Sequence, residues 1–179
     1  MQSFLHIKKI MLVNLLLFSS SLFSQKDTTQ YFNKTLSNNN FSIEVGGKGF
    51  LYSIGYERTI FKSKKMLLAA GVNFSYYPPY TGIAGLDGIM LPIGLSAHFG
   101  KSTNKLSVGI NASNYFANDA YLSIYNDYPL YQLFFVPSIG YRKYFKKGNS
   151  LSIAFTPFFG TNPWYADIPW AGLNYNIKF

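Results

Sequence analysis

Apolar and polar residues alternate with a period of two along most of the chain after residue 40. Within residues 169–179, Tyr175 and Ile177 fall on one face, whereas Asn174 and Asn176 fall on the other. This period places successive side chains on opposite faces of an extended strand. The pattern predicts eight strands, at residues 41–46, 50–60, 66–76, 89–99, 105–115, 132–145, 150–159 and 169–179. The chain is therefore expected to be all-β.

The polar faces of these strands are built from small residues rather than charged ones. In residues 66–76 the polar face reads Ala69, Gly71, Asn73 and Ser75, and the opposite face carries Leu, Val, Phe and Tyr. A soluble barrel would need charged side chains on its wet exterior. Small side chains instead suit the interior of a narrow barrel, and a wide apolar face suits lipid. The pattern predicts an eight-stranded antiparallel transmembrane β-barrel with its apolar face outward.

The connections between the expected strands alternate between short turns and long loops. The short turns are residues 62–65, 100–104 and 146–149, the long loops are 77–88, 116–131 and 160–168, and residues 47–49 are a short exception. Outer-membrane barrels have short periplasmic turns and longer external loops, so both chain ends are expected on the periplasmic side. Four aspartates fall in the long loops, namely Asp87, Asp119, Asp127 and Asp167. The lysines expected at solvated short turns are Lys62, Lys64, Lys65, Lys101, Lys105, Lys146 and Lys147.

Aromatic residues gather near both ends of the expected strands, where they would form the two girdles of a membrane barrel. The outer girdle would contain Tyr76, Tyr77, Tyr80, Tyr115, Tyr131, Trp164, Tyr165 and Trp170. The inner girdle would contain Phe61, Phe99, Tyr144, Phe145 and Phe179.

The composition fits a surface that meets lipid. Aromatic residues are 19% of the chain and charged residues 13%, whereas a typical soluble domain is about 25% charged. After the first 24 residues no apolar run reaches the ~18 residues of a spanning helix, which leaves a closed barrel as the way to cross a bilayer. Cysteine is absent, so no disulfide or thiolate metal site is expected. The net charge is +9, but the lysines are scattered among turns, so no nucleic-acid partner is expected. No cofactor and no metal ion are expected either.

Residues 1–24 have the features of a cleaved signal peptide. Lys8 and Lys9 supply a positive start, residues 10–18 form a short apolar core, and Ser24 precedes the expected cleavage point. Residues 25–40 are polar and predict a flexible periplasmic lead-in. The barrel would then occupy residues 41–179.

The final eight residues, Gly172-Leu173-Asn174-Tyr175-Asn176-Ile177-Lys178-Phe179, resemble the C-terminal signal read by the barrel-assembly machinery. The positions that carry this resemblance are Gly172, Tyr175, Ile177 and Phe179, and Ile177 departs from it because an aromatic residue is common there. Residues 44–58 are similar to a glycine hairpin followed by a strand in many uncharacterised barrels. The chain thus resembles the small outer-membrane β-barrel proteins of Gram-negative bacteria, in the style of the Bacteroidetes. The resemblance implies residence in the outer membrane, contact with its lipid, and the assembly machinery as a partner during biogenesis.

Three charged residues fall on faces expected to line the interior, namely Glu44, Glu57 and Arg142. The strands that carry Glu57 and Arg142 are the second and the sixth of eight, so they lie opposite each other in the ring. An unpaired charge in a narrow interior is costly, so we expect these two side chains to meet across the lumen near its periplasmic end. The pair would be a structural plug or, alternatively, a gate for ions.

His98 is the only histidine after the leader, and Ser96 precedes it on the same face. The pair resembles the serine and histidine of small membrane-barrel lipases and deacylases. Both side chains are expected to point inward, away from lipid, so we expect a polar filler and no catalytic residue.

Eight strands leave little room for an aqueous channel. We therefore expect an integral, non-enzymatic outer-membrane protein that is structural or that binds an unidentified ligand or partner through its external loops. A narrow channel for ions or small solutes is one alternative, and a lipid-modifying enzyme is another.

Overall fold

The computed structural model describes residues 38–78, 87–117, 131–160 and 169–179, and these ranges are the described part of the chain. Their elements are β1 (Asn39–Gly46), η1 (Gly47–Gly49), β2 (Tyr52–Lys62), β3 (Met66–Tyr77), β4 (Gly88–Phe99), β5 (Asn104–Ala117), β6 (Tyr131–Tyr144), β7 (Ser150–Phe155), β8 (Phe159–Gly160) and β9 (Ala171–Lys178). None of the described elements is a helix of the length and apolarity needed to cross a bilayer. The expected leader at residues 1–24 lies outside the described part.

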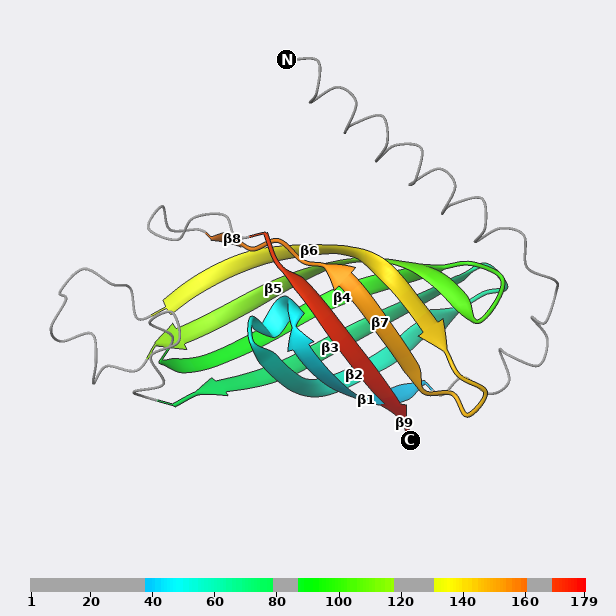
Figure 1. Ribbon diagram of the computed structural model, residues 1–179, viewed down its shortest axis with the longest axis horizontal. Coiled ribbons are helices and arrows are strands. Elements are labelled where there is room, and N and C mark those ends of the chain that lie inside the picture. The colour runs from blue at the N-terminus through cyan, green and yellow to red at the C-terminus, as the bar shows by residue number, and fades with distance from the viewer. Residues whose placement is uncertain (1–37, 79–86, 118–130, 161–168) are drawn as a thin grey trace, which may run out of the picture.

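The strands close into an antiparallel barrel (Figure 1). Neighbours pair in chain order from β1 to β6, β6 pairs with β7 and β8, and β9 closes the ring between β7 and β1. Two pieces, β7 and β8, form one interrupted strand, because Pro157 between them has no N–H to donate to a ladder. The barrel therefore has eight strands in its wall, which confirms the predicted all-β, eight-stranded antiparallel barrel.

Side chains alternate between the exterior and the lumen along each strand. On β5, Ile110 is 57% exposed on the outside, whereas Ser113 is completely buried on the inside. The same division holds for most positions around the ring, with most Leu, Ile, Val and Phe side chains outward and most Ser and Asn side chains inward. The predicted orientation of the two faces is therefore confirmed.

The two ends of the barrel differ in their connections. We call the end that holds the start of β1 and the end of β9 the turn end, because the links after β2, β4 and β6 are short there. It lies to the right in Figure 1. At the opposite loop end, η1 links β1 to β2, and the other strands are joined through residues outside the described part.

Several boundaries differ from those expected. Strand β1 starts at Asn39, so Asn39 and Asn40 pair with Arg58 and Glu57 of β2 instead of belonging to the lead-in. Strand β2 starts at Tyr52 because η1 and the following residues fold into the lumen.

The expected aromatic girdles are correct only in part. Tyr77, Tyr115 and Tyr144 are 2%, 3% and 7% exposed and face the lumen, and Trp170 stacks on Phe50. Those on the exterior, as expected, are Phe61, Tyr76, Phe99, Tyr131, Phe145 and Phe179. Tyr80, Trp164 and Tyr165 lie outside the described part. The inward residues lie at strand ends, where their rings fill the two mouths of the bore.

Candidate functional site

The lumen is crossed toward its turn end by an ion pair between Glu57 of β2 and Arg142 of β6. One guanidinium nitrogen of Arg142 donates to Oε1 of Glu57 at 2.6 Å, and the other donates to Oε2 at 3.0 Å. Both side chains are about nine-tenths buried or more. The strands lie opposite each other in the ring, and both residues lie toward the turn end of their strands. Two parallel charge-assisted hydrogen bonds fix the orientation of both groups and close the bore at this level.

Glu44 does not join that pair, although it faces the same lumen. Its carboxylate accepts a hydrogen bond of 2.9 Å from Ser53 Oγ and interacts with the backbone N–H groups of Lys48 and Gly49. Glu44 therefore holds the short hairpin of η1 against the inner wall. Its role is local to β1 and η1, whereas Glu57 and Arg142 connect strands on opposite sides.

Lys48 is a fourth charged residue of the lumen, and the pattern of strand faces did not indicate it. Gly46 and Gly47 have φ angles of 71° and 69°, values that glycine adopts without a steric penalty, and they turn the hairpin inward. The side chain of Lys48 consequently lines the same cavity as Glu44, Glu57 and Arg142. The one sequence signal for the inward hairpin was the shortness of the connection at residues 47–49, compared with the long loops expected between the other strands at the same end.

A cavity of about 50 Å³ lies between the ion pair and the hairpin. Two carboxylates and two cations surround it, so their formal charges cancel. Two of its polar atoms, Arg142 Nε and Thr156 Oγ1, have no hydrogen-bond partner among the described residues. The volume suits about three water molecules, and such a balanced site offers no strong preference for either sign of ion.

His98 lies at the turn-end side of this region in a chain of hydrogen bonds. Its Nε2 lies 3.2 Å from Ser96 Oγ, and its Nδ1 lies 2.9 Å from Ser107 Oγ. The ring is buried with its edge toward Tyr144. Both nitrogens are thus occupied by hydroxyl groups, so the acid that would orient a catalytic histidine has no place on the ring.

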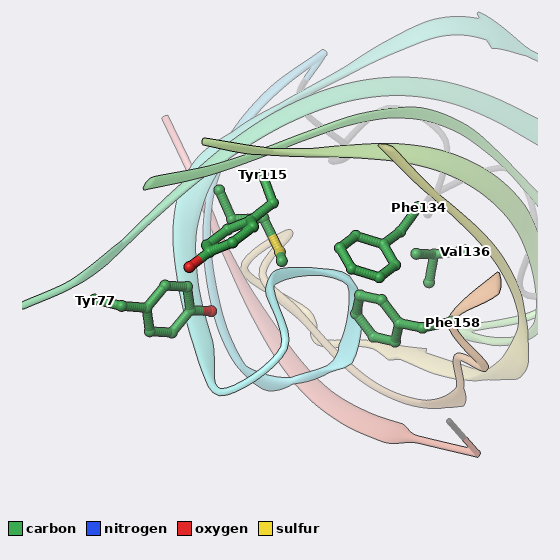
Figure 2. Close-up of a cluster of buried hydrophobic side chains, with 6 residues drawn as sticks. Tyr77, Tyr115, Phe134, Val136 and Phe158 are labelled. Atoms are coloured by element: carbon green, nitrogen blue, oxygen red, sulfur yellow. The ribbon is translucent and has the colours of Figure 1, made fainter. Parts of the chain in front are cut away.

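The loop end of the lumen is filled by an apolar cluster around the hairpin (Figure 2). Tyr77 and Tyr115 lie on one side of the hairpin ribbon, and Phe134, Val136 and Phe158 lie on the other. The hydroxyl of Tyr77 donates to the carbonyl of Gly49. Together these rings seal the bore above the cavity.

The hairpin is also fastened to distant parts of the barrel. Ser113 Oγ donates to the carbonyl of Lys48 at 2.8 Å. Trp170 Nε1 donates to the carbonyl of Phe50 at 2.8 Å, while the two rings stack with centroids 4.9 Å apart. These contacts reach β5 and the start of β9, so the hairpin acts as a fixed plug.

The turn end is closed by a smaller group. Leu67 and Tyr144 pack together there. Lys105 is 2% exposed, and its Nζ donates to the carbonyl of Gly100 at 2.6 Å. The expectation that Lys105 is a solvated turn lysine is therefore wrong, because Lys105 belongs to β5 and lies on the same inward face as Ser107 and Ser113.

The four positions of the expected assembly signal lie in and beside the closing strand β9. Gly172 is buried and faces the hairpin, whereas Tyr175, Ile177 and Phe179 are exposed on the outside. A Cβ at position 172 would lie 2.4 Å from Gly47 Cα and 2.6 Å from Gly47 N. Glycine is thus required at position 172 for the plug to dock.

Replacing Gly172 with alanine is expected to destabilise the barrel by about 1–3 kcal/mol, because backbone rather than a flexible side chain must move. The free energy of unfolding of the refolded protein in urea measures this effect. Gly71→Ala is the matched control, since its Cβ would meet Tyr56 O at an ordinary 3.4 Å. Equal effects of the two substitutions would contradict tight docking of the hairpin.

Neither a cluster of metal ligands nor a similarity to known proteins indicates what the site does. Within the described ranges, no group of three or more His, Cys, Asp or Glu side chains could hold a metal ion. Comparisons of the chain with protein-family models, with curated proteins and with solved structures find no match.

Proposed function

We propose that this protein is an integral barrel of the outer membrane of a Gram-negative bacterium, closed to solutes and without enzymatic activity. In this proposal the barrel is an anchor, and the external loops carry any binding of a ligand or partner. Residues 1–24 would direct the chain to the periplasm, and the signal at residues 172–179 would engage the barrel-assembly machinery.

The apolar exterior carries this proposal. Among the described residues, thirty large hydrophobic side chains are at least 37% exposed. Every strand of the ring contributes to this belt, through Ile43, Ile54, Val72, Ile93, Ile110, Ile139, Ile153 and Leu173. The largest apolar patch on a monomeric soluble protein covers about 300–600 Å², and a belt around a whole barrel exceeds it. Strands β3 to β6 have 12 to 14 residues, which is sufficient for the 9–11 residues or so of a tilted crossing.

The filled lumen supports an anchor rather than a channel. The loop end is packed with aromatic rings, and the Glu57–Arg142 pair spans the bore below the cavity. The geometry of Ser96 and His98 supports the absence of enzymatic activity, because both point into the bore and the imidazole has no acidic partner there.

Refolding the mature chain into detergent and lipid tests this function. The unboiled protein should migrate faster on a gel than the boiled protein, because a closed barrel stays compact in detergent. In planar bilayers the same preparation should give no conductance steps. A chain that stays monomeric in buffer without detergent would contradict the membrane location, and regular steps would favour the alternative of a narrow channel.

A further inference from the structure

We propose that the turn end carries a ring of cations that binds the anionic headgroups of phospholipids in the periplasmic leaflet. This inference rests on the proposed membrane location and adds the lipid class that the barrel selects. The residues of this cationic ring are Arg58, Lys62, Lys64, Lys65, Lys101, Lys143, Lys146, Lys147 and Lys178.

The cationic ring surrounds the barrel instead of forming one flat patch. Its members lie on β2 and the turn after it, on the turn after β4, on β6 and the turn after it, and on β9. All except the partly buried Lys62 are exposed. A circumferential arrangement at one height fits a membrane surface better than a rod-shaped nucleic acid, which would contact one side only.

Acidic side chains do not balance this charge within the described part of the chain. The side-chain carboxylates found there are Glu44, Glu57 and Asp87, and each is at least nine-tenths buried. Two of them face the lumen, and Asp87 lies beside Tyr115 at the loop end. The terminal carboxylate of Phe179 is a single further negative charge at the turn end, beside nine cations. The exterior of the turn end consequently has a strongly positive field directed at whatever surrounds it.

Neighbouring strands bring like charges close together in the cationic ring. Arg58 and Lys178 flank β1 at the turn end, Arg58 opposite the outward-facing Asn39 and Lys178 opposite the buried Asn40, so the two cations lie on opposite faces of the wall. The charge of Lys178 acts unfavourably on Lys62. Repulsion of this kind is relieved when an anion binds between the cations.

The height of the cationic ring identifies the anion. Phe61, Phe99 and Phe145 are exposed aromatics at the turn end, where the apolar belt stops. Aromatic residues in this position mark the interface between hydrocarbon and headgroups. Arg58 and Lys143 project outward from the wall, and their long stems can lie on the belt while their charges reach that interface. Lipid phosphates are the anions held at this height.

Lipid selectivity can be measured with spin-labelled phospholipids in vesicles of phosphatidylcholine that contain the refolded barrel. Electron paramagnetic resonance separates lipid immobilised at the protein from mobile bulk lipid. The barrel should immobilise phosphatidylglycerol over phosphatidylcholine by about threefold at low salt, and molar salt should weaken this preference.

The variant Lys64→Gln, Lys65→Gln, Lys146→Gln, Lys147→Gln removes four of the nine cations and should lower the preference clearly. These lysines lie in exposed turns outside the lumen, so the barrel should still fold. Arginine at the same four positions is the matched control and should keep the preference. Equal immobilisation of both lipids by the parent, or an unchanged preference in the glutamine variant, would overturn the cationic ring. Absence of any immobilised lipid would overturn the membrane location itself.

Discussion

Arginine in place of Ile110 should lower the free energy of unfolding of the membrane-inserted barrel by about 2–4 kcal/mol. Ile110 lies at the middle of β5, 57% exposed, between Leu95 of β4 and Pro137 of β6. In hydrocarbon, the guanidinium at this depth must draw water or headgroups toward itself. On a surface that faces water, the same substitution would change stability by less than about 0.5 kcal/mol. Urea titration of each barrel in lipid vesicles, with the folded fraction read from the fast-migrating band on a gel, measures the difference in unfolding free energy.

Phe99→Arg is the control for this substitution, at an exposed outward position that lies at a different depth. Phe99 is 43% exposed, but it is the last residue of β4 at the turn end. A charge near the interface costs about 0–1 kcal/mol in a membrane barrel. Equal losses at positions 99 and 110 would contradict a hydrocarbon layer around the middle of the barrel.

Leucine in place of Glu57 should destabilise the barrel by about 3–5 kcal/mol, because it leaves the guanidinium of Arg142 buried without its partner. Arg142 is 5% exposed, and its Nε already lacks a hydrogen-bond partner among the described residues. The double variant Glu57→Leu, Arg142→Met should recover most of this loss, since it removes both charges and keeps the volume. Unfolding free energies of the parent, both single variants and the double variant give the coupling energy.

Arg58→Met is the control for the loss of a cation without a buried partner. Arg58 is adjacent to Glu57 in β2, but it is exposed on the outside. It should change stability by less than about 1 kcal/mol. If the losses from Glu57→Leu and Arg142→Met simply add in the double variant, the pair does not hold the two sides of the barrel together.

The alternation of residues was sufficient to predict the wall of the barrel. A period of two leaves open only which face of each strand points outward. The small residues that alternate with Ile43, Ile93 and Ile110 indicated correctly that the isoleucine face is the outer one. The count of strands then placed Glu57 opposite Arg142, and the structure brings them into contact at 2.6 Å. These features follow from local pattern and ring geometry, so one sequence reveals them.

The side chains that fill the two mouths of the lumen were not predicted correctly from the sequence. Tyr77 and Tyr115 look like interfacial residues in the sequence because they lie at strand ends, yet each continues the inward face of its strand after Ser75 and Ser113, and its ring turns into the bore. Lys48 and Phe50 enter the lumen because Gly46 and Gly47 adopt positive φ, which no period announces. Their partners, Ser113 and Trp170, are distant in the chain, so only the closed ring shows that they meet.

The inward hairpin has a consequence for the order of folding. Gly172 lies in the seam between the last strand and the first, and it also lies directly under Gly47. The contacts between β1 and β2 on either side of the hairpin are local in the chain, but the hairpin's anchors on β5 and beside β9 come together only when the cylinder is complete. Docking of the hairpin and closure of the seam should therefore be one late, cooperative event, and an intermediate without β9 would keep its bore open.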